Sequence, residues 1–330
     1  MPNHGKKEAA VAAAESDVAD AQSALDSEKE GLEHAIENRQ AMEQRVERTQ
    51  QALMAAENTL EQVRQECAFR LTAVEQSIQS ANVRLVHAQE ALNAYLAANP
   101  AAKQFYDWLH WQPQAGKPVT PDVIVGRMNL SPEQQRLFHE YLCERNPQYR
   151  ALCDKYRSDF ANAKGDVERF NVVRNIRIHL SGAYAEHLAR QALAPLGGKV
   201  ETQGQTYFED GRYTKTDLLI TGLKVPVILG RGKNMSAPVG GSLACEIKCG
   251  KAEYLYAQSE HMTFQAGGHK NADTHCTLCS RDILELSPER EQKLRNDMRE
   301  AGSPMIGMLP TKDEIDRVVL DDITGQEEQA

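Results

Sequence analysis

The chain has 330 residues, 41% of them hydrophobic, which predicts an elongated part joined to a compact part rather than one globule. Its 38 basic and 47 acidic residues give a net charge of -9, which argues against a simple polycationic nucleic-acid binder. The seven cysteines are odd in number and scattered, which excludes a small disulfide framework and favours a reducing compartment.

The first predicted element is a very long helix from about Lys6 to Ala98, because this stretch has no proline and only one glycine, Gly31. At about 1.5 Å per residue an unbroken helix would be on the order of 130 Å long. A change of register between series of heptad residues predicts a stutter, with Gly31 as the expected place of a break or bend. The apolar heptad residues form three series: Val11, Val18, Leu25 and Leu32; then Val46, Leu53, Leu60, Cys67 and Val74; then Leu71, Ile78, Leu85 and Leu92.

Such a helix cannot bury its apolar stripe alone. We expect the stripe to meet a second copy in a coiled coil, a helical partner protein, or the same helix folded back as a hairpin, with self-association first. A free single helix held by i,i+4 charge pairs is less favoured, because the apolar positions recur so regularly.

Residues 99–165 read as a helical connector. Asn99-Pro100 ends the long helix, and further prolines divide the segment into shorter helices, one of which starts at Ser131-Pro132. Four aromatic residues near its start predict a small helical core rather than a base-stacking platform: Phe105, Tyr106, Trp108 and Trp111.

Residues 166–330 change to an α/β pattern with an acidic C-terminal tail. A helix is predicted from about Val167 to Leu196, and a second from about Ala252 to Gln265. Asp210-Gly211 predicts a hairpin turn, and 230–241 a mobile loop. The predicted strands are 199–203, 205–208, 213–221, 225–229, 243–249 and 277–280.

Three residues on two of these strands suggest a metal-dependent site. Asp217 lies in the strand 213–221, and Glu246 and Lys248 lie in the strand 243–249. Alternate residues of a strand share a face, so Glu246 and Lys248 are expected on one side, with Cys245, Ile247 and Cys249 on the other. Asp217 and Glu246 are the candidate Mg²⁺ ligands, with Mn²⁺ as the alternative ion, and Lys248 is the candidate catalytic lysine. By itself, Glu-x-Lys is more typical of a solvated ion pair.

Other polar residues could support that site. Glu186 lies on the helix before the sheet, and Gln258, His261 and Gln265 fall along one face of the helix after Lys248, with surface solvation as the other interpretation of the histidines. Residues 174–281 carry 13 basic and 9 acidic residues, a local charge of about +4 that suits a polyanionic substrate. The candidate substrate-binding residues are Gln258, His261, His269, Arg231 and Lys233.

A zinc site is the competing interpretation of this region. Cys245, Cys249, Cys276 and Cys279 could bind Zn²⁺ together with His261, His269 or His275. Strand geometry disfavours it, because Cys276 and Cys279 fall on opposite faces of an extended segment, and buried cysteine behaves as a small hydrophobe.

Residues 178–282 resemble the PD-(D/E)xK phosphodiesterase core, and in particular toxin-type nuclease domains of bacterial competition systems. The resemblance rests on Asp217, on Glu246-Ile247-Lys248-Cys249-Gly250, and on Gln258, His261 and Gln265 after them, although Thr216 stands where proline would. It implies a restriction-endonuclease-like mixed central sheet between helices, Mg²⁺ dependence and cleavage of DNA, less often RNA. An acidic residue such as Glu186 and a glutamine such as Gln265 often support the site in this family.

The resemblance also implies biological context. A coiled-coil front on a nuclease suits an antibacterial toxin with a cognate immunity protein, made in the cytoplasm and delivered into a target cell by a secretion system. No run of 18 apolar residues and no apolar signal region is present, so we expect no membrane span. The alternative function is a non-enzymatic coiled-coil adaptor whose α/β domain is stabilised by zinc and binds a partner.

Overall fold

The computed structural model describes residues 4–208, 210–232, 234–268 and 271–325. The chain divides into two compact units, Met1–Ala91 and Leu92–Ala330. Within the described ranges, no helix is both long enough and apolar enough to span a bilayer. The expected order of a long helix, a helical region and an α/β part with a mixed sheet is confirmed.

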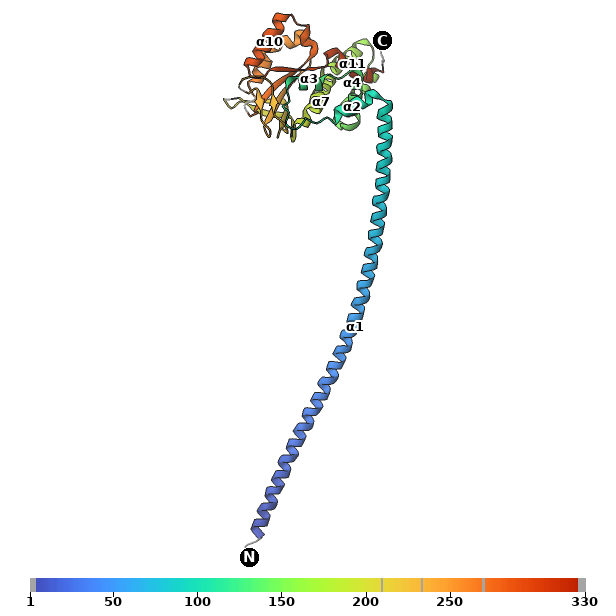
Figure 1. Cartoon of the computed structure of the whole chain (residues 1–330), viewed down its shortest axis with the longest axis vertical. Helices are drawn as coiled ribbons and strands as arrows, with labels where there is room; N and C mark the ends of the chain where they lie inside the picture. The colour runs from blue at the N-terminus through green and yellow to red at the C-terminus, as the bar shows by residue number, and fades with distance from the viewer. Residues whose placement is uncertain (1–3, 209, 233, 269–270, 326–330) are drawn as a thin grey trace. The chain divides into compact units, whose positions relative to one another are not determined.

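Helix α1 (His4–Ala98) is one continuous, gently curved helix (Figure 1). The expected break at Gly31 was wrong, because a glycine costs an exposed helix only about 1 kcal/mol and the flanking residues are strong helix formers. The expected register change is also narrower than proposed: Leu32 and Val46 lie two whole heptads apart, so only the third series departs from the register of the first.

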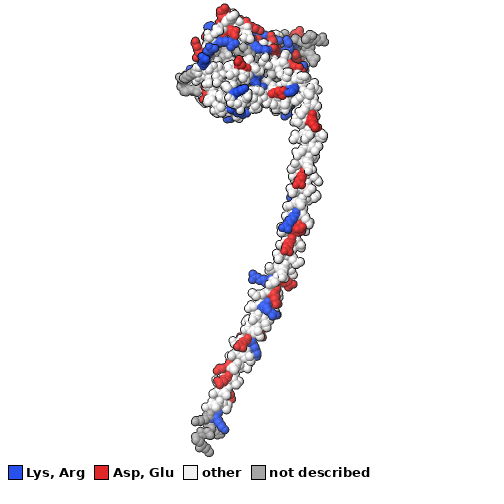
Figure 2. Space-filling view, viewed as in Figure 1, with Lys and Arg blue, Asp and Glu red and all other residues white. Residues whose placement is uncertain are grey.

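The apolar stripe of α1 is exposed to solvent in the single chain. Val18 is 68% exposed and Leu53 is 59% exposed. The other members of the first two series are exposed as well. Acidic and basic side chains are interspersed along the helix, with no long run of one sign on the face in view (Figure 2). The first two series therefore form one apolar seam among mixed charges, which is the pattern of a coiled-coil helix.

Four short helices make the connector, as expected. Each begins with proline in its first turn, where the missing N–H costs no hydrogen bond, and α4 also has a capping box formed by Ser131 and Gln134. Phe105 and Trp108 are buried in their core. The helices are α2 (Pro100–Leu109), α3 (Pro121–Met128), α4 (Pro132–Arg145) and α5 (Pro147–Asn162).

The helix expected from Val167 to Leu196 is nearly continuous but changes its winding twice. It consists of α6 (Asp166–Asn175), a π-helical turn (Ile176–Leu180), α7 (Ser181–Leu193) and a 3₁₀ turn (Ala194–Leu196). Gly197 then lets the chain enter the sheet: a Cβ atom there would lie 2.4 Å from Ile220 Cγ2. Helix α7 buries small and apolar residues in the main core, where it contacts α3, α11 and β5.

Five strands form one mixed sheet in the order β1-β2-β5-β6-β7. Neighbours are antiparallel from β1 to β5 and parallel from β5 to β7. Strands 199–203 and 205–208 were expected to be separate, but they form one strand with an irregular residue at Gln203. The strand expected at 225–229 is shorter and lies outside this sheet, where it pairs with a second strand in the loop 230–241. The strands are β1 (Lys199–Tyr207), β2 (Tyr213–Thr221), β3 (Val227–Ile228), β4 (Ser236–Ala237), β5 (Ser242–Lys248), β6 (Thr274–Ser280) and β7 (Met305–Leu309).

Two helical crossovers join the parallel strands. The helix expected from Ala252 to Gln265 is two helices, α8 (Ala252–Ala257) and α9 (Ser259–Ala266), which meet at Gln258. Beyond β6, where the sequence suggested only an acidic tail, a 3₁₀ turn (Arg281–Glu285) and α10 (Pro288–Glu300) lead to β7, and α11 (Lys312–Thr324) follows. Helix α11 buries Ile315, Val319 and Ile323, so this segment belongs to the fold.

One hydrophobic core runs from the connector helices into the sheet. Phe138 of α4 meets Trp108 of α2 and Tyr184 of α7 in T-shaped contacts, with ring centroids 5.5 and 5.4 Å apart. Leu218 and Ile220 of β2 belong to the same buried cluster. The connector (99–165) and the following segment (166–330) therefore share their packing.

His275 gives the fold a titratable group inside the sheet. It lies on β6, is 3% exposed, and burial lowers its pKa to about 4. An unfolded histidine titrates near pH 6.5, so between about pH 6.5 and 4 the unfolded chain binds the extra proton. The stability that neutral His275 contributes is fully present above about pH 6.5 and is lost as the pH falls through about 4, by up to about 3 kcal/mol.

We expect this loss to be absent in a His275→Gln variant. Urea unfolding of both proteins at neutral pH and near about pH 5 measures it, and the stability advantage of the native chain over the variant should narrow as the pH falls. Parallel pH profiles for the two proteins would contradict the assignment to His275.

Candidate active site

The candidate site lies where β2 and β5 stop pairing. The antiparallel ladder runs from Thr221↔Ser242 to Leu218↔Cys245 and ends there. Beyond the ladder, side chains of β2 replace the backbone as hydrogen-bond partners of β5. Thr216 Oγ1 donates to the Cys245 carbonyl at 3.0 Å, and Asp217 Oδ2 accepts from the Ile247 N–H at 2.7 Å. The Asp217 carboxylate is thus fixed by backbone at the fork of two strands.

Glu246 and Lys248 share one face of β5, as the alternation predicts. Lys248 Nζ lies 3.2 Å from Glu246 Oε2 and 3.9 Å from Asp217 Oδ2, so one ammonium contacts both carboxylates. The opposite face packs inward, with Cys245 and Ile247 in the main core. The structure therefore brings together the three residues on which the sequence motif rests.

The charge of this cluster is costly to bury. Glu246 is almost fully buried, and burial together with the negative charge of Asp217 raises its pKa to about 7, while Lys248 opposes the shift. A carboxyl with this pKa holds a proton on a large share of molecules near neutral pH. Such a pair of neighbouring carboxylates favours a cation in place of the proton, which makes Asp217 and Glu246 suitable oxygen ligands for a divalent metal.

Glu186 of α7 belongs to the same electrostatic cluster. More than a third of its surface is exposed, yet the protein around its carboxyl raises its pKa, as does the charge of Asp217, and Lys248 lowers it. These interactions connect α7 to the two strands. With Asp217, Glu246 and Glu186 against Lys248, the fully ionised site has an excess of negative charge.

Gln203 is a site residue that the motif did not identify. Its Nε2 donates to Asp217 Oδ1 at 3.2 Å, so both carboxylate oxygens have fixed partners. Its backbone has a φ of +55°, a left-handed conformation that costs a non-glycine residue about 1 kcal/mol or more. Gly204, which divides the predicted strands 199–203 and 205–208, was a partial sign of this irregularity.

We expect Gln203→Gly to be more stable than Gln203→Ala by about 1 kcal/mol, because only glycine adopts this φ without strain. Both variants lose the amide that holds Asp217, so any metal-dependent activity should fall equally in the two. Urea unfolding and an activity assay on the same preparations test this. Equal stabilities would show that the left-handed backbone carries no strain.

The residues after Lys248 do not form one continuous helical face. Gln258 is the joint between α8 and α9, His261 is exposed, and Gln265 is half-buried. The Oε1 atom of Gln265 is buried and accepts no hydrogen bond from the described part of the chain. Gln265 is therefore the member of this set with an unmet need for a partner.

The predicted substrate-binding residues are only partly placed. Arg231 is exposed on the turn between β3 and β4 and makes no hydrogen bond or ion pair with the rest of the described chain. Lys233 and His269 lie outside the described residues. Within the described chain, Arg231 makes no contact with Asp217.

The competing cysteine site is not assembled from the residues that the structure describes. Thr274–Ser280 is a strand, and it puts Cys276 in the main core while Cys279 packs in a second cluster with Met262 and Ile283. Cys245 and Cys276 face each other with their sulfurs 3.6 Å apart, buried among apolar residues. Among the described residues, these cysteines do not form a metal-binding group with a histidine.

The geometry thus offers two carboxylates, one lysine and one further acid at the end of a strand pair, held by backbone and side-chain amides. Chemically, such a cluster can hold a divalent cation and place an ammonium beside it. The chain matches no known protein-family model, no curated protein and no solved structure.

Proposed function

We propose that the α/β part of this chain is a Mg²⁺-dependent nuclease that hydrolyses phosphodiester bonds. The observation that carries the proposal is the contact of one ammonium, Lys248, with the carboxylates of Asp217 and Glu246 at the fork of β2 and β5. Mn²⁺ is the natural substitute ion, since it prefers the same oxygen ligands.

A metal requirement follows from the charge of the site. Three carboxylates near one lysine would repel a phosphodiester, and a divalent cation on Asp217 and Glu246 would cancel this excess negative charge. When bound, such a cation supplies Lewis-acid stabilisation of the phosphate oxygens and lowers the pKa of bound water. The mixed sheet between helices agrees with the fold that the PD-(D/E)xK resemblance implies.

The protein's own groups have separate roles in this proposal. The ammonium group of Lys248 would steady the negative charge that develops on the phosphate or orient the attacking water. Gln203 and the Ile247 N–H hold Asp217 in one orientation. Gln265 is the proposed supporting residue, and its buried Oε1, which accepts no hydrogen bond within the described chain, favours this role.

DNA is the proposed substrate, with RNA second. The positive local charge of residues 174–281 supports a polyanion, and Gln258, His261 and Arg231 remain the proposed contacts to it. The test uses the full-length chain with supercoiled plasmid, linear duplex and single-stranded RNA, each with Mg²⁺, Mn²⁺ or EDTA. Metal-dependent cleavage of one of these supports the proposal, and intact substrates under all metal conditions would refute it.

The proposed partner of α1 is a second copy of the chain. The regular, exposed heptad series is the observation that favours self-association. We expect the native chain to have at least twice its single-chain mass of 36.8 kDa in light scattering, and Leu53→Glu with Leu60→Glu to return it to that mass.

A matched control for α1 is Ala55→Glu with Gln62→Glu. These positions lie two residues further on, about 200° around the helix, so they add the same charge away from the stripe. The control should keep the native mass. A native chain that is already monomeric at tens of micromolar would contradict self-association, and the apolar stripe would then be the binding surface for a different protein.

An antibacterial toxin is the proposed biological role, with an immunity protein as partner and secretion-dependent delivery into a target cell. Expression in a bacterial host tests it: the native chain should arrest growth, and Glu246→Ala should not. Growth arrest by both proteins at equal expression would show that the toxicity does not depend on Glu246.

The second candidate is a non-enzymatic coiled-coil adaptor whose α/β part only binds a partner. The exposed stripe of α1 favours it, because that stripe needs a protein partner whatever the rest of the chain does. The cleavage assay separates the two functions. Structural zinc does not, since a zinc-stabilised fold can support either.

A further inference from the structure

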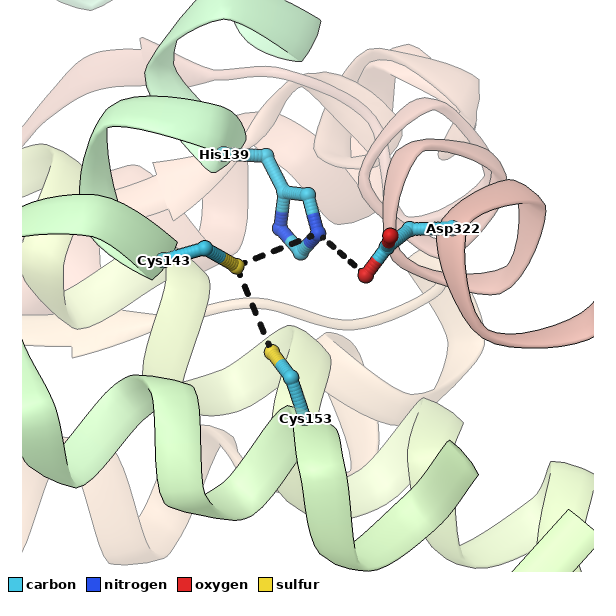
Figure 3. Close-up of side chains that lie close together, drawn as sticks. All are labelled: His139, Cys143, Cys153 and Asp322. Atoms are coloured by element: carbon cyan, nitrogen blue, oxygen red, sulfur yellow. Dashed lines mark hydrogen bonds and ion pairs between the residues drawn. The ribbon is translucent and has the colours of Figure 1, made fainter. Parts of the chain in front are cut away.

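Four metal-ligating side chains converge in the helical part of the chain, away from the site described above. His139 and Cys143 lie one turn apart on α4, Cys153 lies on α5, and Asp322 lies on α11 (Figure 3). One ligand atom of each lies within 4.8 Å of the others. No motif in the sequence points to any of the four.

The separations suit a tetrahedral metal centre. The sulfurs of Cys143 and Cys153 are 3.7 Å apart, and Cys143 Sγ lies 3.8 Å from His139 Nε2. For metal bonds of about 2.3 Å to sulfur and 2.0–2.1 Å to nitrogen, tetrahedral edges are about 3.8 Å between sulfurs and about 3.5 Å between sulfur and nitrogen. The His139 Nε2 to Asp322 Oδ2 distance of 3.0 Å is slightly below the matching edge of about 3.4 Å.

The arrangement does not fit a catalytic cysteine with a histidine base. In such a relay one ring nitrogen faces the nucleophile and the other faces the acid. Here Cys143 and Asp322 both approach the same nitrogen, Nε2, which can make only one good hydrogen bond. A metal ion among them would satisfy the three groups at once.

The groups around the cluster are those that a metal site needs. Nδ1 of His139 lies 2.9 Å from the Tyr149 hydroxyl, a partner that fixes the ring so that Nε2 faces the other ligands. Arg157 donates to the Asp322 carboxylate at 2.6 Å. Two thiolates and one carboxylate carry three negative charges, which Zn²⁺ and Arg157 would balance.

We propose that His139, Cys143, Cys153 and Asp322 bind a structural Zn²⁺ ion. Two thiolates select zinc over harder ions, and four protein ligands leave no open position for a substrate. His139 and Cys153 are buried, while Cys143 and Asp322 reach the surface and give the ion access. The ion joins α11, at the end of the chain, to the α4–α5 pair.

Metal content of the full-length, reduced chain tests this directly. We expect one zinc per chain after reconstitution and dialysis, and a near-ultraviolet charge-transfer band of two thiolates when Co²⁺ replaces zinc. Cys153→Ala should weaken zinc binding by more than about 100-fold in competition with a chelating dye.

Cys276→Ala is the matched control for Cys153→Ala. Cys276 is equally buried and its sulfur lies 3.6 Å from another cysteine, but within the described part of the chain no histidine and carboxylate complete a group with it. This variant should keep one zinc. Equal loss of zinc in the two variants would overturn the proposal, because it would reflect general damage to the core.

Two measurements keep the proposal testable if Cys153→Ala fails to fold. Tyr149→Phe removes only the partner of His139 Nδ1 and should weaken zinc binding by about 10- to 100-fold. The native chain itself gives the second: no zinc retained by the reduced protein, or a Cys143–Cys153 disulfide that zinc does not prevent, would overturn the assignment.

Discussion

Lys248→Ala is expected to lower the rate of Mg²⁺-dependent plasmid nicking by about 100- to 1,000-fold, the usual cost of removing a group that stabilises developing charge. Glu246→Gln should have a loss at least as large. This substitution keeps the shape of the side chain but removes the negative charge of Glu246 that would hold the cation. The neighbouring carboxylate, Asp217, stays fixed by its hydrogen bond from the backbone. Single-turnover nicking with the full-length chain measures both effects.

Lys103→Ala is the control for the loss of a lysine. Lys103 lies on α2 and forms an exposed ion pair with Asp107, an interaction that contributes little in water. Its nicking rate should equal that of the native chain. Activity that survives both Lys248→Ala and Glu246→Gln would show that the cleavage comes from another site or from a contaminant.

The concentration of Mg²⁺ that each variant needs for half-maximal cleavage distinguishes a metal ligand from a group that stabilises charge on the phosphate. A metal ligand such as Glu246 should shift that requirement upward, whereas Lys248→Ala should lower the maximal rate with a smaller shift. The same shift in both variants would place Lys248 on the cation rather than on the phosphate.

The sequence was sufficient where the determining pattern is local. Glu246 and Lys248 share a face because a strand repeats every two residues, and the hydrophobic side of β5 fixes which face that is. The long helix and the proline-started connector helices follow from composition and turn signals that act over a few residues.

The sequence was insufficient where the outcome depends on tertiary packing. Of the expected Gln258/His261/Gln265 face, His261 and Gln265 lie four residues apart on α9, but Gln258 is outside the helix because the chain turns there. At this turn Leu255 and Met262 are both buried in one cluster around the crossover. Helix periodicity alone cannot report such a joint. The left-handed φ of Gln203 likewise occurs together with a tertiary contact, the hydrogen bond from its side chain to Asp217, fourteen residues later.

The candidate zinc cluster and α11 were missed for a related reason. His139 and Asp322 are 183 residues apart, and the cysteines lie in a segment whose pattern indicates only short helices. The acidic composition after residue 282 suggested a tail, but Ile315, Val319 and Ile323 form one face at helical spacing and are buried. A helical search of that segment would have found α11, whereas no local signal would have found its ligand partners.

Phe138→Ala is expected to lower the free energy of unfolding of the compact part by about 3–5 kcal/mol, the usual cost of truncating a buried phenylalanine. Phe138 has no exposed surface and lies in T-shaped contact with both Trp108 and Tyr184. The variant leaves a cavity between α2, α4 and α7. Urea unfolding followed by the fluorescence of the two tryptophans, both near this core, measures the change.

The same variant tests whether the connector and the sheet unfold together. Because their residues share one core, the loss should also appear as faster amide hydrogen exchange in β5, far along the chain from the substitution. Phe170→Ala on α6 is the matched control: this side chain is 67% exposed, so its removal should change stability by less than about 0.5 kcal/mol. If the unfolding midpoint seen by tryptophan fluorescence falls while β5 keeps its protection from hydrogen exchange, residues 99–165 are a separate domain. If both change, the helical connector is part of the scaffold that positions Glu186 near Asp217.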